Sequence, residues 1–204
     1  KEKKKNQTQT THIHTAQLLA AERKLHDWNQ NAQGAFPLQI LLDQLPRNLY
    51  RGNAHAWATD PLALHFALAA IDAKLDAQID ASLRPFCYMA LMQSEDLSLQ
   101  RRSVRLFEAL GGPPLAHALE HCAIIERFGR FPHRNAALGR SSSAPERSYL
   151  EAGGFAGWSA VRWSRSGVAD AQALPIQRAL TEGRVAEHTR ARISFTASRS
   201  TPGI

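Results

Sequence analysis

The chain has 204 residues, of which 44% are hydrophobic, and a formal net charge of +7. This length allows a buried core, since a domain of about 150 residues already hides roughly 70% of its unfolded surface. The longest apolar runs, Leu62 to Ile71 and Phe86 to Met92, fall short of the roughly 20 residues that cross a bilayer, so we expect no membrane-spanning helix and no membrane partner.

The positive charge belongs to the two ends of the chain. Residues 1–15 hold four lysines against one glutamate, and residues 156–204 hold seven arginines against three acidic residues. The segment between them is therefore neutral, whereas nucleic-acid binding needs basic residues clustered on a folded face. We expect no nucleic-acid partner for the central domain.

The first fifteen residues and the cysteines indicate where in the cell the protein is found. The start of the chain is basic and then polar, without the apolar segment that a secretory signal contains. Cys87 and Cys122 each lie in an apolar run and form no Cys-x-x-Cys pair, a pattern typical of buried free thiols. These features predict a cytoplasmic protein.

The first two predicted helices are separated by a turn. Apolar residues recur at helical spacing over residues 15–28, and a turn-rich stretch follows from Asn29 to Gly34. Pro37 suits the first position of the second helix, and Pro46 is expected to end it.

The next two predicted helices each begin near a proline. Asp60 as N-cap and Pro61 at the first position predict an alanine- and leucine-rich helix to about Leu75. A fourth helix is expected over residues 83–92, with its start close to Pro85 because proline is tolerated only near a helix start.

Capping signals delimit the last three predicted helices. Ser94 is expected to cap the fifth helix, which Gly111 ends. Gly129 ends the sixth, and the spacing of Ser143 and Glu146 is that of a capping box that opens a short seventh helix. The residues of the sixth helix expected to face inward are Leu115, Leu119, Cys122 and Ile124 or Ile125.

These patterns predict an all-α fold with one central domain. No strand-like alternation occurs between residues 16 and 155, which we assign to the helical domain. Residues 1–15 form a basic and polar extension. Residues 156–204 are rich in arginine, alanine and serine without a stable apolar period, so we expect a loosely ordered tail.

Three segments are more distinctive than a helical pattern requires: LLDQLPRNLYRG, YMALMQSEDLSLQRRSVRLF and ERFGRFPHRNAALGRSSSAPE. Together they resemble the bacterial domain-of-unknown-function 924 family over roughly residues 16–155. The resemblance implies a fold similar to tetratricopeptide repeats, in which antiparallel helix pairs stack into a right-handed array. No internal 34-residue repeat is visible in the sequence itself.

The chain departs from the family pattern in three places. An N-terminal segment with an aromatic Asp-Phe-Trp-Phe pattern is missing or replaced by the lysine-rich start. Gln93 stands where the family usually carries histidine, so an amide replaces an imidazole. The tail after residue 155 is the third departure.

The polar positions that match the family allow two interpretations. In the functional one, helix ends and the FGRFPHRN loop converge on a concave face, where arginines hold an anion and a histidine moves a proton. In the structural one, arginine–carboxylate pairs and asparagine side chains fasten the turns between helices. The candidate catalytic residues are His121 and His133, and the candidate ligand-binding residues are Asp43, Arg47, Asn48, Arg51, Glu95, Arg127, Arg130, Arg134, Asn135 and Arg140.

His117, Glu120 and His121 match the His-x-x-Glu-His pattern of some zinc peptidases. A catalytic zinc needs a third protein ligand, and no downstream ligand motif is found, so we attribute the match to coincidence. Nucleophile and phosphate-binding motifs are also missing. We expect no metal and no cofactor.

Two functions follow from the sequence. The first is a binding module with an arginine- and histidine-lined concave site for a peptide or a small anionic molecule. The alternative is an enzyme, a hydrolase or transferase acting on a small anionic substrate with His121 or His133 as general base. The sequence predicts no oligomeric state.

Ending the chain after Phe155 should leave the domain folded, because apolar periodicity stops there and the tail has little to add to a core. Thermal unfolding of the shortened chain, followed by circular dichroism, should stay cooperative. Loss of the cooperative transition would contradict this prediction.

Overall fold

The computed structural model describes residues 13–155, in which every regular element is a helix. The predicted all-α class is therefore confirmed. The N-terminal extension up to residue 12 and the tail from residue 156 lie outside the described residues, whereas residues 13–21 are helical. The further elements are η1 (His26–Gln30), α2 (Ala32–Gln39), η2 (Ile40–Gln44), α3 (Leu45–Leu49), η3 (Ala54–Trp57), α4 (Asp60–Asp72), η4 (Asp76–Gln78), α5 (Pro85–Met92), α6 (Leu97–Leu110), α7 (Pro114–Phe128), η5 (Pro132–Arg134) and α8 (Ala144–Glu151).

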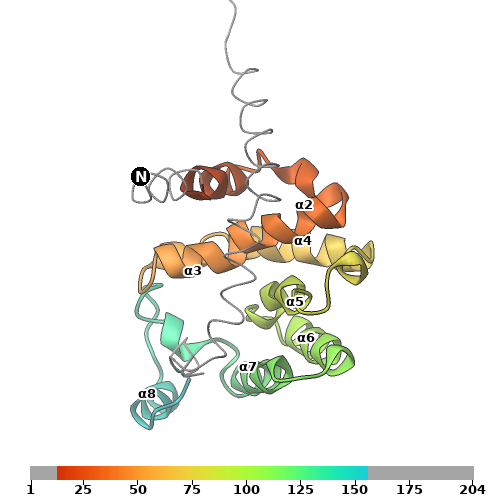
Figure 1. Cartoon of the computed structure of the whole chain (residues 1–204). Coiled ribbons are helices and arrows are strands. Elements are labelled where there is room, and N and C mark those ends of the chain that lie inside the picture. Colours follow the sequence, from red (N-terminus) through yellow and green to blue (C-terminus); the bar gives the residue numbers. More distant parts are fainter. Residues whose placement is uncertain (1–12, 156–204) are drawn as a thin grey trace, which may run out of the picture.

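The helices pack largely in chain order. Helix α4 contacts α2, α5 contacts α4, α6 contacts α5, and α7 contacts α6 (Figure 1). After α7 the chain turns back through η5 toward the end of α3 before it enters α8 (Figure 1). The tetratricopeptide-like right-handed array implied by the family resemblance stays a prediction.

One helical segment runs from α2 through η2 into α3 and contains two prolines. Asn31 caps its start, because its side-chain oxygen accepts the N–H of Gly34 at 3.0 Å. Pro37 lies inside α2, and Pro46 lies in the first turn of α3. The predictions that Pro37 begins this helix and that Pro46 ends it are therefore wrong.

Pro46 is accommodated because η2 is a π-helical turn. A proline lacks the N–H that would bond the carbonyl four residues earlier, here that of Leu42, and its ring crowds that carbonyl. The wider turn makes room for the ring. The Leu42 carbonyl instead accepts the Thr59 hydroxyl at 2.6 Å, which joins this helix to the residue before α4.

Helix α5 lies at the centre of the buried core. Six of its eight residues are buried, as expected for a helix that is apolar on every side. Leu91 packs with Trp28 and Leu42 on one side, while Tyr88 packs with Phe107 on the other. A third cluster joins α7 to the segment between α7 and α8, residues 129–143, which we call the η5 loop, and to Phe155.

Three predicted helix starts or ends differ from those in the structure. The helix expected over residues 15–28 ends at residue 21 and is followed by a turn and η1. Asp60 is the first residue of α4 rather than its cap, because its carboxylate bonds arginines. Asp96, rather than Ser94, caps α6 by accepting the N–H groups of Ser98 and Leu99.

The ends of the last two helices agree with the sequence. Gly129 takes a left-handed conformation after α7, and both hydrogen bonds of the Ser143–Glu146 capping box are formed. Leu119 was expected to face inward, but its exposed fraction is 49%. The inward face of α7 is instead formed by Ala118, His121, Cys122, Ile124 and Ile125.

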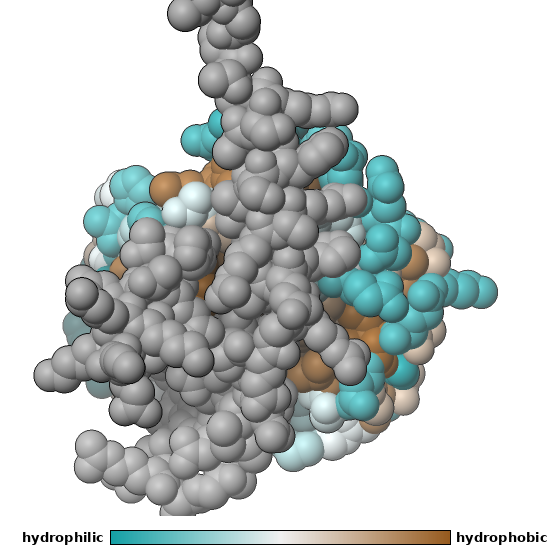
Figure 2. All heavy atoms as spheres, turned by 45° about the horizontal axis from the view of Figure 1, so that its top comes forward, coloured by the Kyte–Doolittle hydropathy of each residue, from teal (hydrophilic) through white to brown (hydrophobic). Residues whose placement is uncertain are grey.

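On the face shown in Figure 2, hydrophobic residues of the described part lie in patches bordered by hydrophilic ones. The large hydrophobic side chains that are exposed, Leu18, Leu49, Leu119 and Leu138, come from separate segments of the chain. Among the helices of residues 13–155, none combines the length and the apolarity needed to cross a membrane.

Candidate functional site

A network of buried charges joins α3, α4 and the η5 loop. The Arg47 guanidinium donates through Nη2 to Asp43 Oδ1 and to Asp60 Oδ1, both at 2.8 Å. Arg134 donates to the second oxygen of Asp60 at 3.3 Å and, through Nη2, to the carbonyl and side-chain oxygens of Gln93 at 3.1 and 2.8 Å. Asp43 and Asp60 therefore neutralise Arg47 and Arg134.

Burial changes the titration of this network. It raises the pKa of the Asp60 carboxyl to about 6, with Arg47 and Arg134 acting in the opposite direction and Asp43 adding repulsion. Burial and the neighbouring charge of Arg47 lower the pKa of Arg134 to about 10, which still leaves it cationic at neutral pH. The network is thus a set of opposite charges held in a poorly solvated place.

A second ion pair fastens the η5 loop to the residues between α5 and α6. Arg140 binds the Glu95 carboxylate through two bonds, of 2.7 and 3.0 Å, and the Phe131 N–H donates to the same carboxylate at 2.8 Å. Burial opposes ionisation of Glu95, but these donors outweigh it and lower the pKa of the carboxyl. Both Glu95 and Arg140 are therefore occupied within the domain.

A third ion pair fixes the start of α8. Arg130 donates through Nε and Nη2 to the two oxygens of Glu146 at 2.6 and 2.8 Å, and the Ser143 N–H donates to the same carboxylate at 2.6 Å. These hydrogen bonds, those of Arg130 first, lower the pKa of the Glu146 carboxyl strongly. The capping glutamate is thereby also the partner of an arginine from the loop after α7.

The two candidate catalytic histidines lie on either side of Phe155. The ring centres of His121 and His133 are 4.6 and 5.0 Å from that of Phe155, and both histidines also contact Phe131. His121 is 4% exposed, and its Nδ1 lies 2.7 Å from the His117 carbonyl. This contact assigns the proton of the neutral ring to Nδ1.

Both histidines are uncharged at neutral pH. Burial lowers the pKa of His121 to about 4 and that of His133 to about 3, and the positive charge of Arg134 adds to both shifts. His121 Nε2 and His133 Nδ1 are buried without a hydrogen-bond partner among residues 13–155. The surroundings of both imidazoles are those of an aromatic core.

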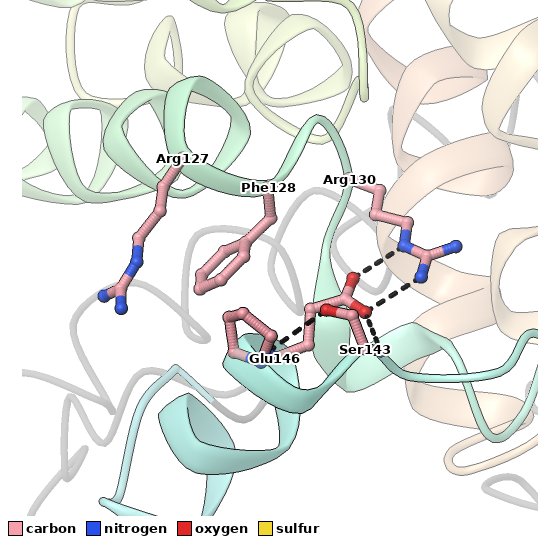
Figure 3. A pocket seen from close by; sticks show the side chains of 6 residues that line it. Arg127, Phe128, Arg130, Ser143 and Glu146 are labelled. Atoms are coloured by element: carbon pink, nitrogen blue, oxygen red, sulfur yellow. Dashed lines mark hydrogen bonds and ion pairs between the residues drawn. The ribbon is translucent and has the colours of Figure 1, made fainter.

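A pocket of about 560 Å³ opens between the end of α7 and the start of α8 (Figure 3). The Arg127 guanidinium carbon lies 4.7 Å from the ring centre of Phe128 and 5.5 Å from that of Tyr149, which are cation–π distances. Within residues 13–155, Arg127 forms no ion pair, in contrast to Arg130. The pocket is lined by Arg127, Phe128, Arg130, Ser143, Pro145 and Glu146.

The structure distributes the candidate residues over several places. Asp43, Arg47 and Arg134 meet in the first network, and Arg127 and Arg130 meet at the pocket. Asn48 and Arg51 are exposed beyond the network, and Asn48 donates to the Gln44 carbonyl within its own helix at 3.1 Å. Asn135 is buried and donates to Ser142 at 3.1 Å.

Some residues of the site region had no role in the sequence-based prediction. Glu146 was identified only as a helix cap, and its pairing with Arg130 has no local signal because the two residues lie in different segments. Phe128 and Tyr149 were not among the predicted site residues. Gln93, which departs from the family pattern, accepts a hydrogen bond from Arg134 at its amide oxygen.

An all-helical domain fastened by buried arginine–carboxylate pairs is the class of protein that the fold and the site define. The chain belongs to the DUF924 family of bacterial proteins of unknown function, whose model matches residues 1–154. It is similar to the solved structure of a protein of unknown function from Agrobacterium tumefaciens, at 46% identity and a TM-score of 0.67, over 69% of this chain and 80% of that one. Among curated proteins, none matches this chain.

Replacing Arg134 by alanine should lower the free energy of unfolding by about 3–5 kcal/mol, because it leaves the Asp60 carboxylate with one buried partner fewer. The loss should be smaller near pH 5 than near pH 8, since the carboxyl can take up a proton instead. Denaturant unfolding at both pH values measures this. Arg101→Ala, at an exposed ion pair, is the control and should stay within about 0.5 kcal/mol of the wild type.

His121 should destabilise the fold as the pH falls. Its folded-state pKa is about 4, so between that value and its usual 6.5 the unfolded chain binds the extra proton, which lowers the free energy of unfolding by up to about 3 kcal/mol. Asp60 acts in the opposite direction because its pKa is raised, so the comparison must be made with a variant.

The measurement is the difference in unfolding free energy between the wild type and His121→Leu at about pH 7 and about pH 4.5. This difference should move in favour of the variant as the pH falls. Ile124→Val, a buried change on the same helix without a titratable group, should keep a constant difference. A constant difference for His121→Leu as well would refute the prediction.

Proposed function

We propose that the domain is a binding module that takes a small anionic molecule, or the anionic end of a peptide, in the pocket between α7 and α8. The observation that carries this proposal is the state of Arg127. Its guanidinium rests on the aromatic rings of Phe128 and Tyr149 at the edge of a pocket, and no carboxylate of residues 13–155 neutralises it.

The arginines of the network are less suited to bind an anion from outside. Arg47 and Arg134 are deeply buried and bind carboxylates of the domain itself, and Arg140 is engaged by Glu95. A ligand anion would have to displace these carboxylates and leave them buried without partners, at several kcal/mol each. Arg127 can accept an anion without breaking an existing pair.

Arg130 supports the same pocket in a second way. Its Nε and Nη2 are held by Glu146 and by the Ser141 carbonyl, which fixes the guanidinium in one orientation at the pocket wall (Figure 3). A fixed donor loses little entropy on binding. Arg127 would thus supply the positive charge, and Arg130 would supply hydrogen-bond donors held in a fixed orientation.

The enzyme alternative has weaker support in the geometry. A general base works best when its pKa lies near the operating pH, whereas those of His121 and His133 are about 4 and 3. Both rings pack against Phe155 rather than line the described pocket. The charges and the cavity therefore favour binding over proton transfer.

The proposal can be tested with a panel of acetate, succinate and inorganic phosphate, followed by amide NMR shifts of the isotope-labelled protein. We expect the shifts to concentrate at residues 127–130 and 143–146. Arg127→Gln should weaken binding by about 10- to 100-fold, the effect of losing one charge-assisted hydrogen-bonded pair. The matched control Arg105→Gln, at an exposed arginine of α6, should bind like the wild type. Equal binding by Arg127→Gln would disprove the proposal.

A further inference from the structure

The lining of the pocket carries information on the class of ligand. Phe128 lies between the Arg127 guanidinium and the Arg130–Glu146 pair (Figure 3), and Pro145 adds a second apolar ring to the lining. The Phe128 ring is flat, and the Pro145 ring is rigid and apolar. A ligand that touches them and an arginine at once needs an apolar body as well as an anionic group.

The charge of the lining limits the charge of the ligand. Arg127 and Arg130 are opposed by Glu146, so the lining has a net charge of +1. Glu146 cannot turn away, because Arg130 and the Ser143 N–H hold both of its oxygens. A dianion such as phosphate would therefore meet a fixed carboxylate, whereas a single carboxylate matches the available charge.

The position of Arg127 favours a planar anionic group. Its guanidinium carbon lies 4.7 Å from the centre of the Phe128 ring, and within residues 13–155 no carboxylate forms an ion pair with its N–H groups. A carboxylate bonds the edge of a guanidinium through two parallel hydrogen bonds. The apolar body of the ligand would then extend toward Phe128 and Pro145.

We propose, as a refinement that rests on the proposed function, that the pocket selects a single carboxylate attached to an aromatic or similarly flat apolar group. Two sources share this chemistry: a free aromatic acid, and the C-terminal carboxylate of a peptide that ends in an aromatic residue. The volume of about 560 Å³ lies within the usual range of small-molecule sites and has room for either.

The test compares ligands that differ in one group, with isothermal titration calorimetry on the full chain. N-acetylphenylalanine should bind about 10- to 100-fold more tightly than N-acetylglycine, as expected for burial of one aromatic side chain. It should also bind at least tenfold more tightly than its neutral amide and than inorganic phosphate. Phe128→Leu should reduce the preference for the aromatic ligand, and its melting curve shows whether the variant is folded.

The outcomes separate this inference from the proposed function. Suppose that N-acetylphenylalanine and N-acetylglycine bind equally, or that phosphate binds more tightly, and that Arg127→Gln weakens this binding. The inference would then be overturned, and the anion site would stand. If no anion binds in a way that depends on Arg127, both the inference and the proposed function are overturned. Comparison of phenylacetate with the peptide Gly-Gly-Gly-Phe assigns the source, and tighter binding of either supports the inference.

Discussion

A guanidinium group that is almost fully buried must be paired, because an uncompensated charge inside a protein costs several kcal/mol. Arg47 meets this constraint by holding two carboxylates with one nitrogen, Asp43 from its own helix and Asp60 from the start of α4. Asp60 in turn accepts a hydrogen bond from Arg134 of the η5 loop, 74 residues further along the chain. The return of the chain after α7 to the first helices therefore depends on satisfying the charges around Arg47.

The same region contains the π-helical turn η2, and the two features are connected. Pro46 prevents a regular α-helix and leaves the Leu42 carbonyl without its usual partner. The π turn and the Thr59 hydroxyl resolve this defect. Asp43 lies within that turn, and Asp60 directly follows Thr59, so the hydrogen bond that repairs the helix also brings the two carboxylates to Arg47.

The arginines of this domain differ in what neutralises them. Arg47, Arg130, Arg134 and Arg140 each bind a carboxylate of the domain, and such pairs fix loops that have no regular secondary structure. Arg127 instead lies on aromatic rings, which lower its energy without cancelling its charge. Most of these pairs therefore fasten turns between helices, whereas Arg127 forms no ion pair within residues 13–155 and lies at a pocket.

The sequence by itself determined the all-helical class and those helix ends that local capping decides, such as Gly129 and the Ser143–Glu146 box. It also identified most charged residues of the network, but not their pairing. Pro46 was predicted to end its helix, but the distant Thr59 hydroxyl bonds the Leu42 carbonyl that Pro46 leaves without a partner. Asp60 was predicted to cap α4, but its carboxylate binds two arginines instead. Capping and periodicity act over a few neighbouring residues, so a sequence can show them directly. Which arginine meets which carboxylate, and which stays unpaired beside a pocket, depends on how distant segments pack, and only the tertiary structure decides that.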